Sequence, residues 1–363
     1  MTIKTLVLSG GAYKGLYMMG AISYLQEKKY IKPDKIKKFY CISVGGLIAV
    51  LMALEIPWDE LFYYILKRPW DKLIDLTPDM IVSMLYKKGL FNIEVFYVFL
   101  RNLFVMKGVS IDITMSEFHD LTEKEIYMYA YNVDNCKLDE ISWKTRPDQK
   151  LIEALYQSCS LPFVFEPIMY QGTYFIDGNL ICSYPLKLCL EDGIKRKEIF
   201  CILIDSSKKE MKIREKDNIF SFGFTLFSQL VSLSSEKYLL DSHTSIHKQE
   251  EYKSPKHKSL VTNDTKISNG DEINIEKNKE KKEKKEKKEK KEKKEKKEKK
   301  EKKEKKEKKE KKEKKIKQMF IPALPLDKDT AIKFIKEESE RQKMIDSGIT
   351  YAKLYLKYLK KNE

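Results

Sequence analysis

Residues that commonly bind metals are scarce in this sequence. It contains four histidines among 363 residues, and only His119 lies before residue 240. The six cysteines form no C-x-x-C pair, and most have apolar neighbours: Cys41, Cys136, Cys159, Cys182, Cys189 and Cys201. The pattern argues against a zinc site and favours reduced, buried thiols in an intracellular, cytoplasmic protein.

Long apolar runs are also missing. The longest extends from Phe39 to Leu54, is interrupted by Ser43 and two glycines, and is shorter than the ~20 residues that a membrane-spanning helix needs. The first residues, MTIKTLVLSGG, are typical of a strand and a turn, and they lack the charged and long apolar regions of a signal peptide. We therefore expect neither a transmembrane segment nor a signal peptide.

Basic charge is abundant but concentrated in one segment. Residues 280–315 are a pure Lys-Lys-Glu repeat, whose 24 Lys and 12 Glu contribute +12 of the formal net charge of +16. The remainder has an ordinary balance, so nucleic acid is not expected as a partner of the folded part. Because the repeat has no apolar residue, we interpret it as a solvated spacer, with binding of RNA or anionic lipid as the alternative.

The chain opens with two strand-turn-helix patterns. The first has a strand at residues 6–8, a glycine-rich turn at 9–15 and a helix at 16–29. The second has a strand at 38–42, a sharp turn at Ser43 and an almost wholly apolar helix at 44–54. Two such units joined by right-handed crossovers predict an α/β fold with a parallel sheet.

Later segments extend this α/β pattern and divide the chain into three predicted regions. We expect helices within 59–107, at 148–159 and at 219–240, and strands at 126–133, 174–176 and 198–204. From about Asp241 the composition becomes polar and charged. The predicted regions are a folded domain at 1–240, a low-complexity segment at 241–315 and a C-terminal helical segment at 316–363.

The turn SGGAYKG, from Ser9 to Gly15, presents backbone amides at the start of a helix and so suits an anion. It is not a Walker A loop, because Leu16-Tyr17 follow the last glycine. A dinucleotide fingerprint would need glycine where Ala12 stands, so that interpretation is weak. The third interpretation is an oxyanion hole, which requires a nucleophilic serine nearby.

Ser43 in YCISVGG meets that requirement. The stretch matches the nucleophile elbow G-x-S-x-G except that Cys41 replaces the first glycine, while Gly45 and Gly46 follow the serine. Turns after adjacent parallel strands lie side by side at the carboxyl edge of a sheet, so this turn should face the glycine-rich one. An ordinary buried serine is the alternative.

Asp177 in YFIDGN is the candidate base. No histidine stands at a strand end beside a turn, whereas Asp177 ends a short predicted strand and Gly178 permits a tight turn after it. A carboxylate that is fixed and partly desolvated can accept a serine proton. A plain β-turn is the alternative interpretation of the Asp-Gly pair.

These motifs together resemble those of the patatin-like phospholipases, most closely the forms found in large DNA viruses. The resemblance covers roughly residues 3–205 and rests on four stretches in the right order and spacing. They are GGAYKG at 10–15, CISVG at 41–45, ALYQSCSLPFVFEP at 154–167 and DGN at 177–179. It implies a three-layer patatin-like fold, with a central, mostly parallel sheet flanked by helices and a charged low-complexity insertion.

The resemblance also implies roles for single residues. Ser43 would be the nucleophile, Asp177 its base, and the amides of Gly10, Gly11 and Ala12 the oxyanion hole, with no metal or other cofactor. The flanking motif residues are Lys14, Gly15, Gly45 and Gly178. Lys14 would either attract a lipid phosphate or be an exposed lysine that ends the loop.

The implied activity is phospholipase A-type cleavage of fatty-acyl esters in phospholipids or other acyl lipids. Cys41 and Asn179 depart from the family pattern, so the alternative is a catalytically weak lipid-binding pseudoenzyme of the same fold; a tether that acts through the charged repeat is a third hypothesis. A lipid substrate implies peripheral contact with a membrane. Candidate contacts are the helix Phe220 to Leu233 and the tail Tyr351 to Lys361, and for each the alternative is packing on the core.

Overall fold

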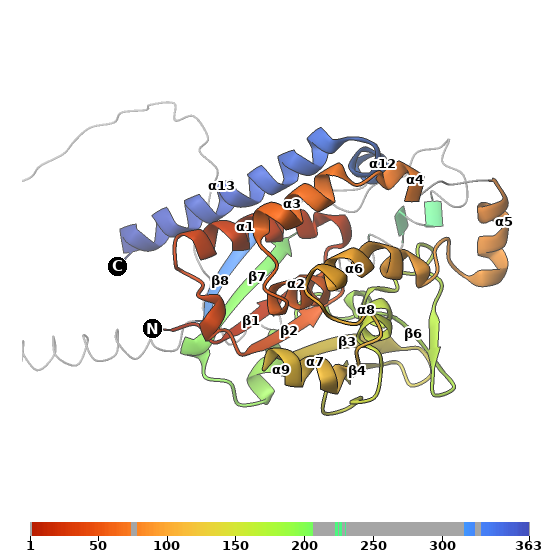
Figure 1. Cartoon of the computed structure of the whole chain (residues 1–363), viewed down its shortest axis with the longest axis horizontal. Helices are drawn as coiled ribbons and strands as arrows, with labels where there is room; N and C mark the ends of the chain where they lie inside the picture. The colour runs from red at the N-terminus through yellow and green to blue at the C-terminus, as the bar shows by residue number, and fades with distance from the viewer. Residues whose placement is uncertain are drawn as a thin grey trace, which may run out of the picture. The chain divides into compact units, whose positions relative to one another are not determined.

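The computed structural model describes residues 2–73, 78–205, 222–223, 225–226, 229, 316–323 and 328–362. In these residues, helices surround a central eight-stranded sheet (Figure 1). The Lys-Lys-Glu repeat and most of the predicted helix at 219–240 lie outside the described residues. None of the described helices is long and apolar enough to cross a membrane.

The sheet is mostly parallel, as predicted. In spatial order its strands are β5 (Ile168–Tyr170), β6 (Thr173–Asp177), β3 (Glu125–Asn132), β2 (Lys38–Ile42), β1 (Thr5–Leu8), β7 (Ile199–Asp205) and β8 (Lys317–Pro322), with β4 (Lys137–Ile141) also paired to β3. The pairs of β1 with β2 and β7, of β2 with β3, and of β7 with β8 are parallel. The β3–β4, β3–β6 and β5–β6 pairs are antiparallel.

The helices follow the order expected for an α/β chain. They are α1 (Gly15–Glu27), α2 (Val44–Ala53), α3 (Trp58–Lys67), α4 (Trp70–Leu73), α5 (Pro78–Lys87), α6 (Glu94–Met106), α7 (Met115–Thr122), α8 (Leu151–Cys159), α9 (Leu186–Glu191), α12 (Lys328–Lys336) and α13 (Glu338–Asn362). Both predicted strand-turn-helix units, β1–α1 and β2–α2, are confirmed. The sequence analysis identified neither β4, β5 and β8 nor the short helix α9.

Both faces of the central strands are buried, which explains their nearly continuous apolar sequences. In β2, Phe39 and Cys41 join the main core with residues of α1 and α2. Tyr40 points to the other face, where its ring stacks on Tyr127 at 4.7 Å and its hydroxyl donates to Asp192 at 2.6 Å.

The C-terminal residues belong to the same sheet and core as the N-terminal ones. Strand β8 runs parallel to β7, from the Phe200–Lys317 pair to the Asp205–Pro322 pair. The chain on the two sides of the charged repeat thus contributes to one sheet. The region boundaries at 240 and 316 remain a prediction from composition.

Helix α13 lies along α1 (Figure 1), and two glycines allow the close approach. A Cβ at Gly20 would lie 2.2 Å from the Ile345 carbonyl oxygen, and one at Gly348 would lie 2.0 Å from the Tyr17 carbonyl oxygen. Further along α13, the Tyr355 ring contacts the core residue Phe200, with ring centroids 5.7 Å apart. The alternative interpretation of the tail was that it packs on the core. Ala352 and Tyr355 of this helix do so.

Candidate active site

Ser43 occupies the turn between β2 and α2. Its backbone has φ 54° and ψ −127°, a conformation that non-glycine residues rarely adopt and that often occurs at functional sites. Its amide donates to the Ser158 hydroxyl at 3.0 Å, and that hydroxyl donates to the Tyr129 carbonyl at 2.8 Å. Helix α8, through Ser158, and strand β3 thus hold the strained turn in place.

The glycine-rich turn lies directly against this elbow. A Cβ at Gly45 would be 2.7 Å from the Leu8 carbonyl oxygen and 2.9 Å from that of Ser9. A Cβ at Gly15 would be 2.4 Å from a methyl carbon of Val44. The structure therefore brings together the two turns that the sequence predicted to face each other, and these two glycines make the contact possible.

Asp177 reaches Ser43 because of how β3 is paired. Met128 of β3 pairs with β2 on one edge and with β4 on the other, and Tyr129 is the last β3 residue to pair with β2. The next residue, Ala130, pairs with both β4 and Asp177, so β6 continues the sheet on the edge where β2 ends. The end of β6 therefore meets the turn that leaves β2.

The two side chains form a short hydrogen bond. The Ser43 hydroxyl donates to Asp177 Oδ2 at 2.6 Å, and the amide of Asn179 donates to Asp177 Oδ1 at 2.8 Å. The amide of Asp177 itself donates to the Ser160 carbonyl at 2.9 Å. A Cβ at Gly178 would lie 2.7 Å from the Tyr129 carbonyl oxygen, so glycine allows this turn to pack on β3. Both carboxylate oxygens of Asp177 therefore have fixed partners.

The Ser43–Asp177 pair is almost inaccessible to solvent, and burial is the largest influence on the pKa of its carboxyl group. Ser43 is 4% exposed and Asp177 is 3% exposed. Burial raises the pKa of Asp177 to about 7, while the hydrogen bonds from Ser43 and Asn179 act in the opposite direction. The adjacent thiol of Cys159 is buried as well, and burial together with the Asp177 charge raises its pKa. Such a carboxyl group can both accept and return a proton near neutral pH.

The predicted oxyanion amides are not equivalent. The Gly10 amide donates to the Ser183 carbonyl at 3.1 Å. Within the part of the chain that the structure describes, the Gly11 and Ala12 amides donate no hydrogen bond. Ala12 adopts φ 50°, so this turn is strained as the elbow is. The Gly11 and Ala12 amides are thus able to donate to an anion bound at this turn.

Asn179 lies over the glycine-rich turn. A Cβ at Gly10 would be 2.6 Å from the Asn179 Oδ1 atom and 2.8 Å from its Cγ atom. Oδ1 is buried and has no hydrogen-bond partner in the described residues. Asn179, which departs from the family pattern, therefore places a polar side chain beside the glycine-rich turn. The hydrogen bond from its backbone amide to Asp177 is retained.

The structure corrects one expectation and separates other residues from the site. Lys14 is only 4% exposed, so it is not the exposed loop lysine that the sequence suggested. His119 stacks on Trp143 with ring centroids 4.1 Å apart, and it pairs with Asp120. Among the described residues, no group of histidine, cysteine or acidic side chains could hold a metal ion.

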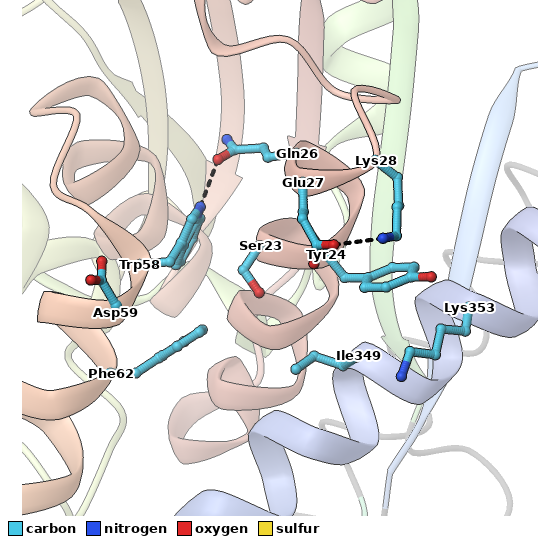
Figure 2. Close-up of a pocket in the computed structure, with 10 residues that line it drawn as sticks. All are labelled: Ser23, Tyr24, Gln26, Glu27, Lys28, Trp58, Asp59, Phe62, Ile349 and Lys353. Carbon is cyan, nitrogen blue, oxygen red and sulfur yellow. Dashed lines mark hydrogen bonds and ion pairs between the residues drawn. The ribbon is translucent and has the colours of Figure 1, made fainter.

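A surface groove of about 740 Å³ lies away from these residues, between α1, α3 and α13 (Figure 2). Its wall includes Trp58, which donates to Gln26 at 2.6 Å, and Tyr24, whose ring lies near the ammonium groups of Lys28 and Lys353. None of its ten lining residues is a predicted site residue. The groove is therefore separate from the dyad.

Sequence reasoning did not assign a role to Ser158, Ser160 or Cys159. All three lie in the stretch that supported the resemblance, but their contacts depend on how the end of α8 meets the β2 turn and β6. The only indication in the sequence was an apolar helix that ends in small polar residues, which could have suggested that its end lies at the site. Nothing in the sequence alone shows that the Ser158 hydroxyl accepts the Ser43 amide.

Comparison with known proteins identifies the family. A family model described as patatin-like phospholipase matches residues 6–190, about half of the chain. The chain belongs to the patatin-like phospholipase family. The central sheet flanked by helices is accordingly a patatin-like fold.

Two relatives are viral. A protein named probable lipid hydrolase 463L, from Invertebrate iridescent virus 6, is 33% identical over 197 residues, which cover 54% of this chain and 66% of that protein. The uncharacterized protein R571 of Acanthamoeba polyphaga mimivirus is 27% identical over 244 residues, covering 65% of this chain and 80% of that protein. This patatin-like chain thus spans just under two thirds of the iridescent virus protein.

Solved structures show more distant similarity. VipD from Legionella pneumophila is 17% identical with a TM-score of 0.36, and the match covers 70% of this chain and 58% of VipD. The type III effector ExoU is 14% identical with a TM-score of 0.33, covering 66% of this chain and 54% of ExoU. The match thus spans little more than half of each of these proteins.

Proposed function

We propose that this patatin-like chain is a lipid acyl hydrolase that cleaves fatty-acyl esters of phospholipids through a Ser43–Asp177 dyad. The observation that supports it most is the 2.6 Å hydrogen bond from the Ser43 hydroxyl to a buried carboxylate whose pKa lies near 7. Family membership and the lipid-hydrolase name of the iridescent virus relative agree with it.

The proposed reaction has two halves. Ser43 Oγ attacks the ester carbonyl carbon while its proton passes to Asp177 Oδ2, and the amides of Gly11 and Ala12 stabilise the oxyanion. The carbon–oxygen bond to the alcohol breaks, and Asp177 returns the proton to the leaving oxygen. Water then attacks the acyl-serine, gives its proton to Asp177, and releases the fatty acid as Ser43 regains its proton. Every proton taken up is returned, and no metal takes part in any step.

The Gly10 amide has a different role in this proposal. Its hydrogen bond to the Ser183 carbonyl fixes the start of the glycine-rich turn, and so it positions the two amides that follow. Gly11 and Ala12 together offer two donors, and each donor in such a hole contributes ~2.7 to 4 kcal/mol to transition-state stabilisation.

The test is hydrolysis of mixed phospholipid vesicles in the presence of a chelator, with wild type, Ser43→Ala and Asp177→Asn compared. We expect activity in wild type, none above background in Ser43→Ala, and a loss of about 10²- to 10⁴-fold in Asp177→Asn. A fluorophosphonate probe should label Ser43 in the wild-type protein. Vesicle binding without hydrolysis or labelling would instead establish the lipid-binding pseudoenzyme.

A further inference from the structure

Helix α5 exposes an apolar stripe. Val82, Leu85 and Tyr86 are 58%, 64% and 80% exposed, and their spacing of three and four residues places them on one side of the helix. Lys87 and Lys88 follow directly and are also exposed. We call these five residues the α5 face. Figure 1 shows α5 at the periphery of the fold, beyond α6.

This face is connected to the segment between α8 and β5. The amides of Leu90 and Phe91 donate to the Val164 carbonyl at 3.1 and 3.0 Å, and the Glu166 amide donates back to the Phe91 carbonyl at 2.8 Å. Lys87 forms an ion pair with Glu166 at 3.8 Å. The end of α5 is thus held against the residues that follow α8.

The same segment leads to the dyad. Ser160, at its start, accepts the Asp177 amide, and β5 at its other end pairs with β6, whose last residue is Asp177. The segment adds one more exposed apolar side chain, Phe163 at 48%, and the adjoining strand β5 adds another, Met169 at 54%. Exposed apolar residues therefore lie in and beside the segment between α8 and β5, whose Ser160 carbonyl accepts a hydrogen bond from the Asp177 amide.

We propose that the α5 face, with Phe163 and Met169 beside it, docks on the surface of a phospholipid membrane that contains anionic headgroups. The inference rests on the proposed lipid hydrolase function. A phospholipid substrate lies in a bilayer, so the enzyme must bring Ser43 and Asp177 close to the bilayer surface to cleave it. Valine and leucine can enter the acyl boundary, tyrosine suits the interface, and lysine extends its charge to the headgroups. The two exposed lysines supply the complementarity to negative charge; Lys87 also pairs with Glu166 at 3.8 Å, and the Lys88 ammonium lies 5.4 Å from the centre of the Tyr174 ring.

The test uses the full-length chain with Ser43→Ala, so that lipid is not consumed. Cosedimentation is measured with phosphatidylcholine vesicles that contain or lack phosphatidylglycerol. The test variant replaces Val82, Leu85 and Tyr86 with serine, and the matched control replaces Leu121 and Val105, which are 57% and 68% exposed on other helices, with serine. We expect the test variant to lose at least about tenfold in binding, and the control to bind as the parent does.

A second variant tests the charge. Lys87→Glu with Lys88→Glu keeps the apolar stripe, so it should abolish the preference for vesicles that contain phosphatidylglycerol. Because only exposed side chains change, it also serves if the serine variant fails to fold. Unchanged binding by both variants would overturn the proposal, as would a wild-type dimer that the serine variant disrupts without losing vesicle binding.

Hydrolysis separates this proposal from the proposed function. With Ser43 restored, the serine variant should cleave a short, monomeric ester at the wild-type rate but lose vesicle hydrolysis in proportion to binding. If wild type binds vesicles through the α5 face and cleaves neither substrate, the hydrolase proposal fails and the docking surface stands. Normal vesicle hydrolysis by the serine variant would contradict the docking surface alone.

Discussion

Replacing Asp177 with asparagine should stabilise the protein, and increasingly so as pH rises. The folded protein binds the Asp177 proton up to about pH 7, whereas the unfolded chain releases it near the ordinary value of 3.8. Between these values the folded state holds the extra proton, so the free energy of unfolding falls as pH increases. Asparagine has no such proton, and its amide can donate to Ser43 while its oxygen accepts from the Asn179 amide.

The difference between the two pKa values sets the magnitude. At about 1.4 kcal/mol per pKa unit, ionising Asp177 in the folded protein costs roughly 4 kcal/mol in all. Part of this cost is already present at pH 5, because the unfolded chain is ionised there. The free energy of unfolding of Asp177→Asn relative to wild type should therefore increase by about 2 to 3 kcal/mol between pH 5 and pH 8.

Urea unfolding of both proteins at several pH values measures this change, with Asp59→Asn at an exposed carboxylate as the control. In wild type, the free energy of unfolding should fall with pH while activity rises: kcat/KM on a monomeric ester increases through pH 7, since only ionised Asp177 can accept the Ser43 proton. A stability difference that stays constant from pH 5 to pH 8 would refute the buried, proton-binding carboxyl group.

Three further substitutions test the surroundings of Ser43 and Asp177, and a fourth tests the packing of α13 on α1. Ser158→Ala leaves the Ser43 amide without its acceptor and should cost about 1 to 3 kcal/mol of stability in urea unfolding, with reduced kcat; unchanged kcat would contradict a positioning role. Cys41→Gly should cost about 1 to 2 kcal/mol without increasing hydrolysis, and a large gain in rate would show that cysteine impairs the elbow. Asn179→Ala keeps the backbone donor to Asp177, so vesicle hydrolysis should persist, and a tenfold loss would assign the side chain a part in the reaction. Gly348→Ala should lower stability by about 1 to 3 kcal/mol through its backbone contact with α1, and a wild-type unfolding midpoint would contradict that close packing.

The parts that the sequence could predict depend on local patterns. A strand, a tight turn and an apolar helix occur twice within the first 54 residues, and parallel pairing then brings Ser43 to the same sheet edge as Gly11 and Ala12. Asp177 became the candidate base because no histidine stands at a strand end beside a turn, and the resemblance to the family motif assigned it that role. Each of these inferences used short local patterns, together with a general rule of sheet topology or the order of the family motifs.

The parts that could not be predicted depend on pairing between distant residues. Strand β8 joins β7 across more than one hundred intervening residues, and a six-residue strand beside a charged repeat gives no signal of its own. The Gly10 amide was assigned to the oxyanion hole because its position in the motif is right, but a carbonyl from Ser183, 173 residues later, accepts it. An exposed loop lysine was one of the two interpretations of Lys14, and its burial depends on the fold packed around it.

The departure at Cys41 follows from where space is restricted around the elbow. After the serine, the backbone of β1 leaves no room for a side chain at Gly45, where a Cβ would be 2.7 Å from a carbonyl oxygen. Before the serine, the side chain at position 41 points into the main core and is completely buried among apolar residues. A glycine there would leave a void, whereas cysteine fills this space on the strand that leads to Ser43. In this chain the backbone of β1 therefore requires glycine at position 45, whereas position 41 can hold a larger side chain.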